Sequence, residues 1–341
     1  MKQVKITSLL AFVLCANLAF AQQELVYVTN EDANSLTVID GGTHELLAQV
    51  PVGQRPRGLR TSADGRLIYV ATSGSPKCPP SMADEDCAKL KTDKSKDGIA
   101  IVDALTLKVI GTLPSGSDPE QFDLSPDGKT MYIANEDAHL MTVVDIVKRK
   151  IVKQIPVGKE PEGVCVSPDG KLVGITSESD RNISLIDTRT LKVIAKIIVG
   201  QRPRNLVFSS DGHFAYVSGE FDQSVTVIDV KTKKAIKTIN LPEGTLPMGL
   251  VISPDNRYLY VSNGRAKTIS VVNLSTNTVE KSLEVGKRPW GIALSSDGKW
   301  LYTANGSSND ITVVDVQTFS VHKKLTVEKT PWGIVVGKNV K

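Results

Sequence analysis

Hydrophobic and polar residues alternate along this chain in short runs rather than in helical stripes. Residues 247–286 are a good example, because four apolar runs lie between turn signals such as Ser253-Pro254-Asp255. The runs are 250–252, 258–262, 269–273 and 279–285, and the last is the most polar. Alternation with β-branched and aromatic residues is typical of strands. The stretch is therefore predicted to form four strands and no helix.

One short motif, Pro-X-Gly or a close variant of it, recurs seven times along the chain. Its prolines are 42 or 44 residues apart, except for one interval of 63 residues that contains an insertion. The seven prolines are Pro56, Pro119, Pro161, Pro203, Pro247, Pro289 and Pro331. Four short antiparallel strands in each of seven repeats predict an all-β fold, a seven-bladed β-propeller of four-stranded blades.

The two ends of the repeat array predict how the ring closes. The repeats start on a second strand, residues 25–29, and they end on a first strand, residues 333–336. We therefore predict that the C-terminal strand completes the first blade, which ties the termini together and removes an exposed edge.

The first 21 residues have the pattern of a secretory signal peptide. Lys2 and Lys5 precede an apolar run at 9–18, and Ala19-Phe20-Ala21 provides the cleavage site. We expect a mature protein of residues 22–341 that forms a single propeller domain, is a monomer, and is periplasmic or secreted. No later stretch is apolar and long enough to span a membrane.

Charge and cysteines narrow the functional classes further. Loss of Lys2 and Lys5 lowers the net charge from +4 to +2, which gives no electrostatic reason to expect nucleic acid or a membrane surface as a partner. The insertion, at about 74–96, contains Cys78 and Cys87, which are predicted to form a disulfide in an exported protein. Cys165 lies in an apolar alternation and is predicted to be a buried thiol. The insertion is either a tolerated surface loop or a lid or docking element.

The X residues of the seven links are predicted to surround one mouth of the central channel, because each link enters an inner strand there. They are Arg57, Glu120, Glu162, Arg204, Met248, Trp290 and Trp332, and Arg288 precedes the sixth proline. Links between second and third strands add Glu31, Glu136, Glu178, Glu220 and His139 to the same face.

This variation in charge has two interpretations. The first is structural: Arg57 pairs with Glu120, Glu162 pairs with Arg204, and the tryptophans are packing wedges. The second is a ligand site in which arginines bind an anionic group and the indoles stack on a planar or apolar one. Its candidate residues are Arg57, Glu120, Glu162, Arg204, Arg288, Trp290 and Trp332.

Signals for catalysis are weak, so the sequence favours binding over an enzyme. The four histidines lie in different repeats without metal-ligand spacing, and no histidine accompanies Cys78 and Cys87, so no metal site is assigned. A haem-attachment motif and a nucleophile elbow are both missing from the sequence. Glu120 and Glu162 could form an acid/base pair, which keeps a hydrolase as an alternative. No catalytic residue is assigned.

Four tetrapeptides carry a resemblance to the YVTN family of β-propeller repeats. They are Tyr27-Val28-Thr29-Asn30, Tyr132-Ile133-Ala134-Asn135, Tyr260-Val261-Ser262-Asn263 and Tyr302-Thr303-Ala304-Asn305. Within this group the chain is similar to the exported propellers associated with pyrroloquinoline-quinone-dependent alcohol catabolism, on the leader, the seven repeats, the insertion and the Arg-Pro-Arg and Arg-Pro-Trp links.

That resemblance implies a periplasmic accessory protein with a dehydrogenase or a cytochrome as its partner, and it makes pyrroloquinoline quinone (PQQ) a candidate ligand. A small anionic ligand fits the arginines of the mouth. The alternatives are a lactonase-like hydrolase, a single-stranded DNA-binding propeller and an envelope interaction module. Few aromatic residues and a near-neutral charge disfavour the DNA-binding alternative.

Overall fold

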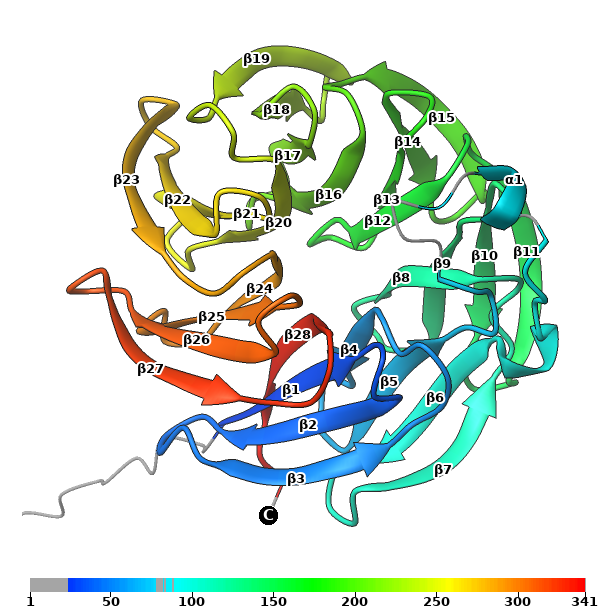
Figure 1. The fold of residues 1–341 in the computed structure, drawn as a ribbon. Coiled ribbons are helices and arrows are strands. Elements are labelled where there is room, and N and C mark those ends of the chain that lie inside the picture. The colour runs from blue at the N-terminus through cyan, green and yellow to red at the C-terminus, as the bar shows by residue number, and fades with distance from the viewer. Residues whose placement is uncertain (1–23, 78–81, 83, 88, 341) are drawn as a thin grey trace, which may run out of the picture.

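Seven four-stranded sheets are arranged in a ring (Figure 1). The computed structural model describes residues 24–77, 82, 84–87 and 89–340, and the regular secondary structure in these ranges consists almost entirely of strands. Neighbouring strands within each sheet are antiparallel. The predicted seven-bladed propeller is confirmed.

Each blade is listed here from its innermost strand outwards. Blade 1 contains β28 (Pro331–Lys338), β1 (Glu24–Asn30), β2 (Ser35–Asp40) and β3 (Leu46–Pro51), and blade 2 contains β4 (Leu59–Thr61), β5 (Leu67–Thr72), β6 (Gly98–Asp103) and β7 (Lys108–Leu113). Blade 3 contains β8 (Pro119–Leu124), β9 (Thr130–Asn135), β10 (Leu140–Asp145) and β11 (Lys150–Pro156), and blade 4 contains β12 (Pro161–Val166), β13 (Leu172–Ser177), β14 (Asn182–Asp187) and β15 (Lys192–Ile198).

The remaining three blades follow the same order. Blade 5 contains β16 (Pro203–Phe208), β17 (Phe214–Gly219), β18 (Ser224–Asp229) and β19 (Lys234–Asn240), and blade 6 contains β20 (Pro247–Ile252), β21 (Tyr258–Asn263), β22 (Thr268–Asn273) and β23 (Thr278–Glu284). Blade 7 contains β24 (Pro289–Leu294), β25 (Trp300–Asn305), β26 (Asp310–Asp315) and β27 (Ser320–Thr326).

Blade 6 tests the strand predictions directly. Its outer three strands lie within one residue of the predicted runs, but β20 begins at Pro247, three residues before the predicted run at 250–252. The reason is that Pro247 already pairs with Asn263 before a register shift leads to Leu250. The Pro-X-Gly link is therefore part of the inner strand in this blade.

The ring closes as predicted, because β28 pairs with β1 and completes blade 1. Tyr27 lies opposite Val335, and Val26 lies opposite Val336. The two ends of the described chain thus lie in one sheet (Figure 1), so closure depends on contacts between residues that are about three hundred positions apart.

The hydrophobic core lies between neighbouring blades. One cluster joins Leu25 and Leu36 of blade 1 to Leu59 and Ile68 of blade 2, and all four are at most 3% exposed. Complete burial of such a side chain contributes about 1.5–3 kcal/mol. The outermost strands are largely exposed, so each blade is stabilised by the blades beside it.

The seam between blades 7 and 1 differs from the others at the face opposite the links. In blades 2, 4 and 7 the left-handed position in the turn between third and fourth strands is occupied by Leu107, Leu191 and Phe319, and each packs against a hydrophobic cluster; in blades 3, 5 and 6 it is occupied by the polar residues Arg149, Lys233 and Asn277. In blade 1 this position is His44, which is 1% exposed. Its ring packs edge-on to Trp300 at 4.7 Å between ring centroids, and its Nε2 lies 3.3 Å from the Tyr302 hydroxyl.

The insertion of blade 2 connects β5 to β6 on the link face. It contains α1 (Asp84–Cys87) and η1 (Lys94–Lys96), and Arg55 Nη1 donates to the carbonyls of Ser75 and Pro76. Cys78 lies outside the described residues, so the predicted Cys78–Cys87 disulfide stays a prediction. None of the described helices is long and apolar enough to cross a bilayer.

Candidate ligand site at the channel mouth

The backbone of each link fixes its X residue at the mouth. The residue before each proline has a left-handed φ, from 44° at Arg55 to 58° at Thr330. Glycine follows X in five links because the next blade approaches closely. A Cβ at Gly163 would lie 2.6 Å from the carbonyl oxygen of Arg204, and one at Gly291 would lie 2.6 Å from that of Trp332. Close backbone packing therefore accounts for the glycine in these five links.

Two links lack this glycine, and their side chains interact with each other. Gln121 of blade 3 and Asn205 of blade 5 occupy the glycine position, and Asn205 Nδ2 donates to Gln121 Oε1 at 3.2 Å. The bond spans blade 4, whose link carries Gly163. Sequence reasoning did not find this contact, although the missing glycines in two alternate repeats were a signal for it.

Arg57 of blade 2 is enclosed by carboxylates of blade 3. Its guanidinium group forms ion pairs with Asp118 at 2.6 Å, with Glu120 and with Glu136 at 3.5 Å. Only 3% of its side chain is exposed. Arg57 and Glu120, which were both predicted site residues, are thus brought together as partners of one another.

Arg204 of blade 5 is the centre of a second buried network. Its guanidinium group contacts Glu162 and Glu178 of blade 4 and Glu220 of its own blade, the last at 2.7 Å. Arg202 also pairs with Glu178, at 2.7 Å. The structural interpretation of the Glu162–Arg204 pair therefore agrees with the observed contacts. Buried arginines with several carboxylate partners have little capacity left to bind a ligand.

Tryptophans occupy the side of the mouth formed by blades 7 and 1. Trp290 and Trp332 are tilted against each other with 5.5 Å between ring centroids. Arg204 and Arg288 both lie over the Trp290 ring, at 5.0 and 4.8 Å from its centroid. Such contacts contribute about 0.5–1 kcal/mol at exposed sites and more when desolvated.

Arg288 differs from Arg57 and Arg204 in its environment. It is exposed, and it forms no ion pair with any residue that the structure describes. Although Arg288 is exposed, partial desolvation by the groups around it, together with the positive charge of Arg204, lowers its pKa below the ordinary value. Among the predicted site residues, Arg288 is the cation whose guanidinium group stays accessible to a ligand.

The carboxylates of blades 3 and 4 have pKa values shifted in opposite directions. Burial raises the pKa of Glu162 well above its usual range, against the charge of Arg204, and the charge of Glu178 raises it further. Burial also acts on Glu178, but the hydrogen bond from Glu162 and the charges of Arg204 and Arg202 outweigh it and lower the pKa to about 2. The surroundings therefore favour the protonated form at Glu162 and the ionised form at Glu178.

Glu136 is the carboxylate of this cluster that reaches solvent. Its side chain is 37% exposed, yet desolvation among the surrounding blades raises its pKa to about 7, against the charge of Arg57. The charges of Asp118 and Glu178 raise it further. A carboxylate with this pKa exchanges a proton near neutral pH, as a general base must.

A narrow cavity of about 120 Å³ lies below the mouth in the channel. Its lining includes Glu162, Arg204, Trp290, Trp332 and Cys165. Cys165 is partly buried and forms no disulfide, and burial raises the pKa of its thiol to about 12, so it is unreactive at neutral pH. The volume admits only a small group, and a larger ligand must lie over the mouth itself.

The fold and the charged mouth define the chain as a seven-bladed β-propeller. Two family models match parts of it: "Lactonase, 7-bladed beta-propeller" over residues 188–334 and "YNCE-like beta-propeller" over residues 81–168. Both descriptions are of β-propellers, which agrees with the fold predicted from the repeats. No curated protein matches the sequence significantly.

Solved structures share the fold at low sequence identity. Hydrazine synthase of Kuenenia stuttgartiensis is 23% identical, with a TM-score of 0.70 over 85% of this chain and 92% of that chain. A candidate 6-phosphogluconolactonase of Bacteroides fragilis is 20% identical, with a TM-score of 0.72 over 93% and 99%. A protein of unknown function from Desulfotomaculum acetoxidans is 19% identical, with a TM-score of 0.74 over 92% and 99%. At these identities the likeness concerns the fold alone.

Proposed function

We propose that this protein is an exported, non-catalytic binding propeller that holds a small anionic ligand at its channel mouth and supports PQQ-dependent dehydrogenase catabolism. One observation carries the proposal: the Arg288 guanidinium group lies on Trp290 and is exposed, whereas Arg57 and Arg204 are surrounded by carboxylates. An exposed cation on an indole suits a planar ligand that carries a carboxylate. PQQ has this chemistry, and the resemblance to exported quinone-associated propellers supports it.

The test is a calorimetric titration of the protein with PQQ. Arg288→Met removes the charge, and a lost charge-assisted hydrogen bond of about 1.5–3 kcal/mol weakens binding at least about tenfold. Lys299→Met is the matched control, because the Lys299 ammonium lies 4.9 Å from the centroid of Trp300, the first residue of β25, in the same kind of contact. Equal affinity of wild type and Arg288→Met, or no binding by wild type, contradicts the proposal.

Lactone hydrolysis is a second candidate function, and Glu136 favours it. This carboxylate is partly exposed at the mouth, and its pKa of about 7 suits the activation of a water molecule. The match of residues 188–334 to a lactonase model supports the same class. Glu120 and Glu162, the acid/base pair considered from the sequence, are both buried, and burial raises the pKa of Glu162 well above its usual range, so this pair is less suited than Glu136 to activate a water molecule.

Hydrolysis is tested by incubating the protein with simple γ- and δ-lactones and following ring opening. General-base catalysis contributes about 10²–10⁴-fold, so Glu136→Gln should lower kcat by at least about a hundredfold. Asp137→Asn is the control, because Asp137 is the next residue in the same loop and pairs with Lys94 instead. Wild-type protein without lactone turnover excludes this candidate and leaves the binding proposal intact.

A further inference from the structure

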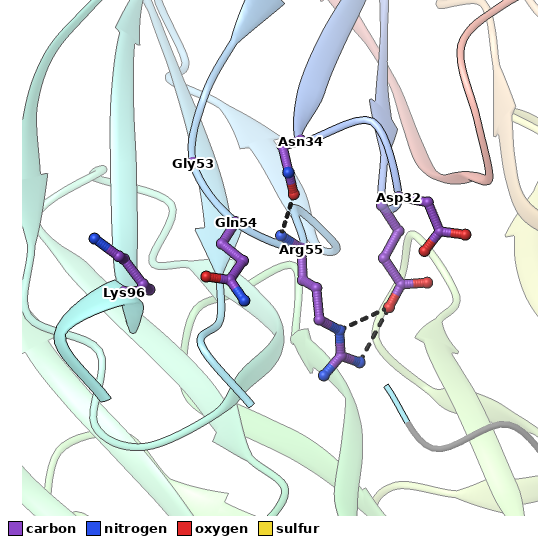
Figure 2. Close-up of a pocket in the computed structure, with 7 residues that line it drawn as sticks. Asp32, Asn34, Gly53, Gln54, Arg55 and Lys96 are labelled. Carbon is purple, nitrogen blue, oxygen red and sulfur yellow. Dashed lines mark hydrogen bonds and ion pairs between the residues drawn. The ribbon is translucent and has the colours of Figure 1, made fainter. Parts of the chain in front are cut away.

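The insertion of blade 2 helps to build a second cavity on the link face, separate from the channel. This cavity has a volume of about 480 Å³ and lies between blades 1 and 2. Figure 2 shows Asn34, Gln54 and Arg55 between Asp32 on one side and Lys96 on the other. Gly53, with a φ of +125°, also lines it. Lys96 comes from η1 of the insertion, so one wall exists because the insertion is present.

The backbone that carries Lys96 is fixed by several contacts. Asp93 caps η1 by accepting a hydrogen bond from the Ser95 amide at 3.1 Å. The carbonyl of Lys96 accepts a hydrogen bond from Thr72 at 3.1 Å, and Lys94 pairs with Asp137 at 3.4 Å. The Lys96 ammonium therefore extends from an anchored turn. It forms no ion pair with any residue that the structure describes.

Other charged groups of the cavity are already occupied. Arg55 donates to Glu31 at 3.0 and 3.1 Å and to the carbonyls of Ser75 and Pro76. Asp32 accepts hydrogen bonds from Lys77 at 2.9 Å and from Thr330 at 2.6 Å. These contacts make the walls rigid, but they leave no free guanidinium group and no free carboxylate among the described lining residues.

The groups that stay available are mainly donors. They are the Lys96 ammonium, the Gln54 carboxamide and the Asn34 amide nitrogen, because Asn34 Oδ1 already accepts a hydrogen bond from the Arg55 amide at 2.9 Å. Donors of this kind recognise oxyanions, and the lining includes no aromatic ring or aliphatic side chain for an apolar ligand. The cavity is therefore chemically unlike the channel mouth.

We propose that this cavity is a binding site for a small hydrophilic oxyanion, a carboxylate or a phosphate ester, held by Lys96, Gln54 and Asn34. The site gives the insertion a role: it supplies the only charged group of the described lining that is uncommitted. Its ligand does not contact Trp290 or Arg288, so the proposal does not depend on the function of the mouth.

The test is a titration of the full-length mature protein with inorganic phosphate and, separately, with citrate, followed by the side-chain amide signals of Asn34 and Gln54 in nitrogen-correlated NMR spectra. Saturable shifts of both signals support the site, and the tighter of the two probes identifies its ligand class. Lys96→Met should weaken the binding at least about tenfold. Unmoved Asn34 and Gln54 signals with both probes overturn the proposal.

A matched variant distinguishes the site from general charge effects. Lys129→Met removes one lysine from a turn of blade 3, between β8 and β9, where Lys129 pairs with Asp127 at 4.0 Å. Its titration should follow wild type. Equal weakening in Lys96→Met and Lys129→Met would show a nonspecific dependence on net charge and would also overturn the proposal.

Discussion

The Pro-X-Gly links play opposite parts at two seams of the ring, the seam between blades 4 and 5 and the seam between blades 7 and 1. At the first, Arg204 crosses to Glu162 and Glu178, and all three side chains are buried. At the second, Trp290 meets Trp332, and Arg288 is left exposed above them. The comparison teaches that charge at an X position does not by itself indicate a ligand site. A site requires a charged group that the neighbouring blade leaves without a partner.

Removal of Arg204 should produce the largest effect. Arg204→Met leaves Glu162, Glu178 and Glu220 without their shared cation, and breaking a buried ion pair from one side costs about 3–5 kcal/mol. Unfolding by urea, followed by circular dichroism, measures this loss. The double variant Arg204→Met with Glu162→Gln should recover part of the lost stability, because the second substitution makes one of the three buried carboxyl groups permanently neutral. An Arg204→Met protein as stable as wild type would show that the network is not structural.

The two seams are also predicted to respond to acid in different pH ranges. Glu178 has a lowered pKa, so its contribution to stability is complete above about pH 4.5 and is lost as the pH falls towards 2. Burial and the charges of His322 and Lys323 lower the pKa of His44, against the charge of Asp40. Because the unfolded chain then binds a proton more readily, the seam between blades 7 and 1 loses stability as the pH falls below about 6.5.

His44→Leu tests this difference. The variant restores the residue found at the same turn position in blades 2 and 4, Leu107 and Leu191, and it should be more stable than wild type at pH 5.5 by on the order of 1 kcal/mol. The advantage should shrink at pH 7.5. Thermal unfolding of both proteins at both pH values measures this advantage. Glu136 has the opposite effect, because its raised pKa favours the folded state as the pH falls towards 4.5. Both proteins contain Glu136, so its contribution cancels when their stabilities are subtracted.

A reverse variant serves as the control. Leu107→His places an imidazole in the equivalent turn of blade 2, where Leu107 packs against the core shared by blades 1 and 2. It should introduce a loss of stability below about pH 6.5 that wild-type blade 2 does not have. A pH dependence that is identical in wild type and His44→Leu would show that the imidazole is not the sensitive group.

The repeat made the fold predictable, but it did not predict which X residues are buried in ion pairs and which residues of the links stay exposed. The spacing of Pro56 and its six equivalents determined the number of blades, and the strand types at the two ends predicted closure by β28. The same register placed Arg57, Arg204 and Arg288 on one face. Their different exposure depends on whether the next blade supplies a carboxylate within reach. This is set by the distance between side chains of different blades, which the sequence does not give. Arg57 also pairs with Asp118, which precedes Pro119 in the next link. Pairing each X residue only with other X residues was therefore too simple.

His44, which lies at the seam between blades 7 and 1 on the face opposite the links, shows the same limit of prediction from the sequence. Its three aromatic-ring neighbours and near-complete burial come from the contact of blade 1 with blade 7, which joins residues far apart in sequence. The signal available in the sequence was a histidine at a turn position where three of the other six repeats carry an apolar residue, Leu107, Leu191 or Phe319.

Removal of Arg288 should produce the smallest effect on stability, and this sharpens the comparison with Arg204. Arg288→Met gives up a contact with Trp290 that contributes about 0.5–1 kcal/mol, and it leaves no described carboxylate unpaired. Urea unfolding under the conditions used for Arg204→Met measures the difference between the two arginines. A loss of about 3 kcal/mol or more would place Arg288 in the structural class with Arg204 and would remove the basis for a ligand site at the mouth. A loss below about 1 kcal/mol, together with weaker PQQ binding, would assign the two seams to different roles: one holds the ring together, and the other binds.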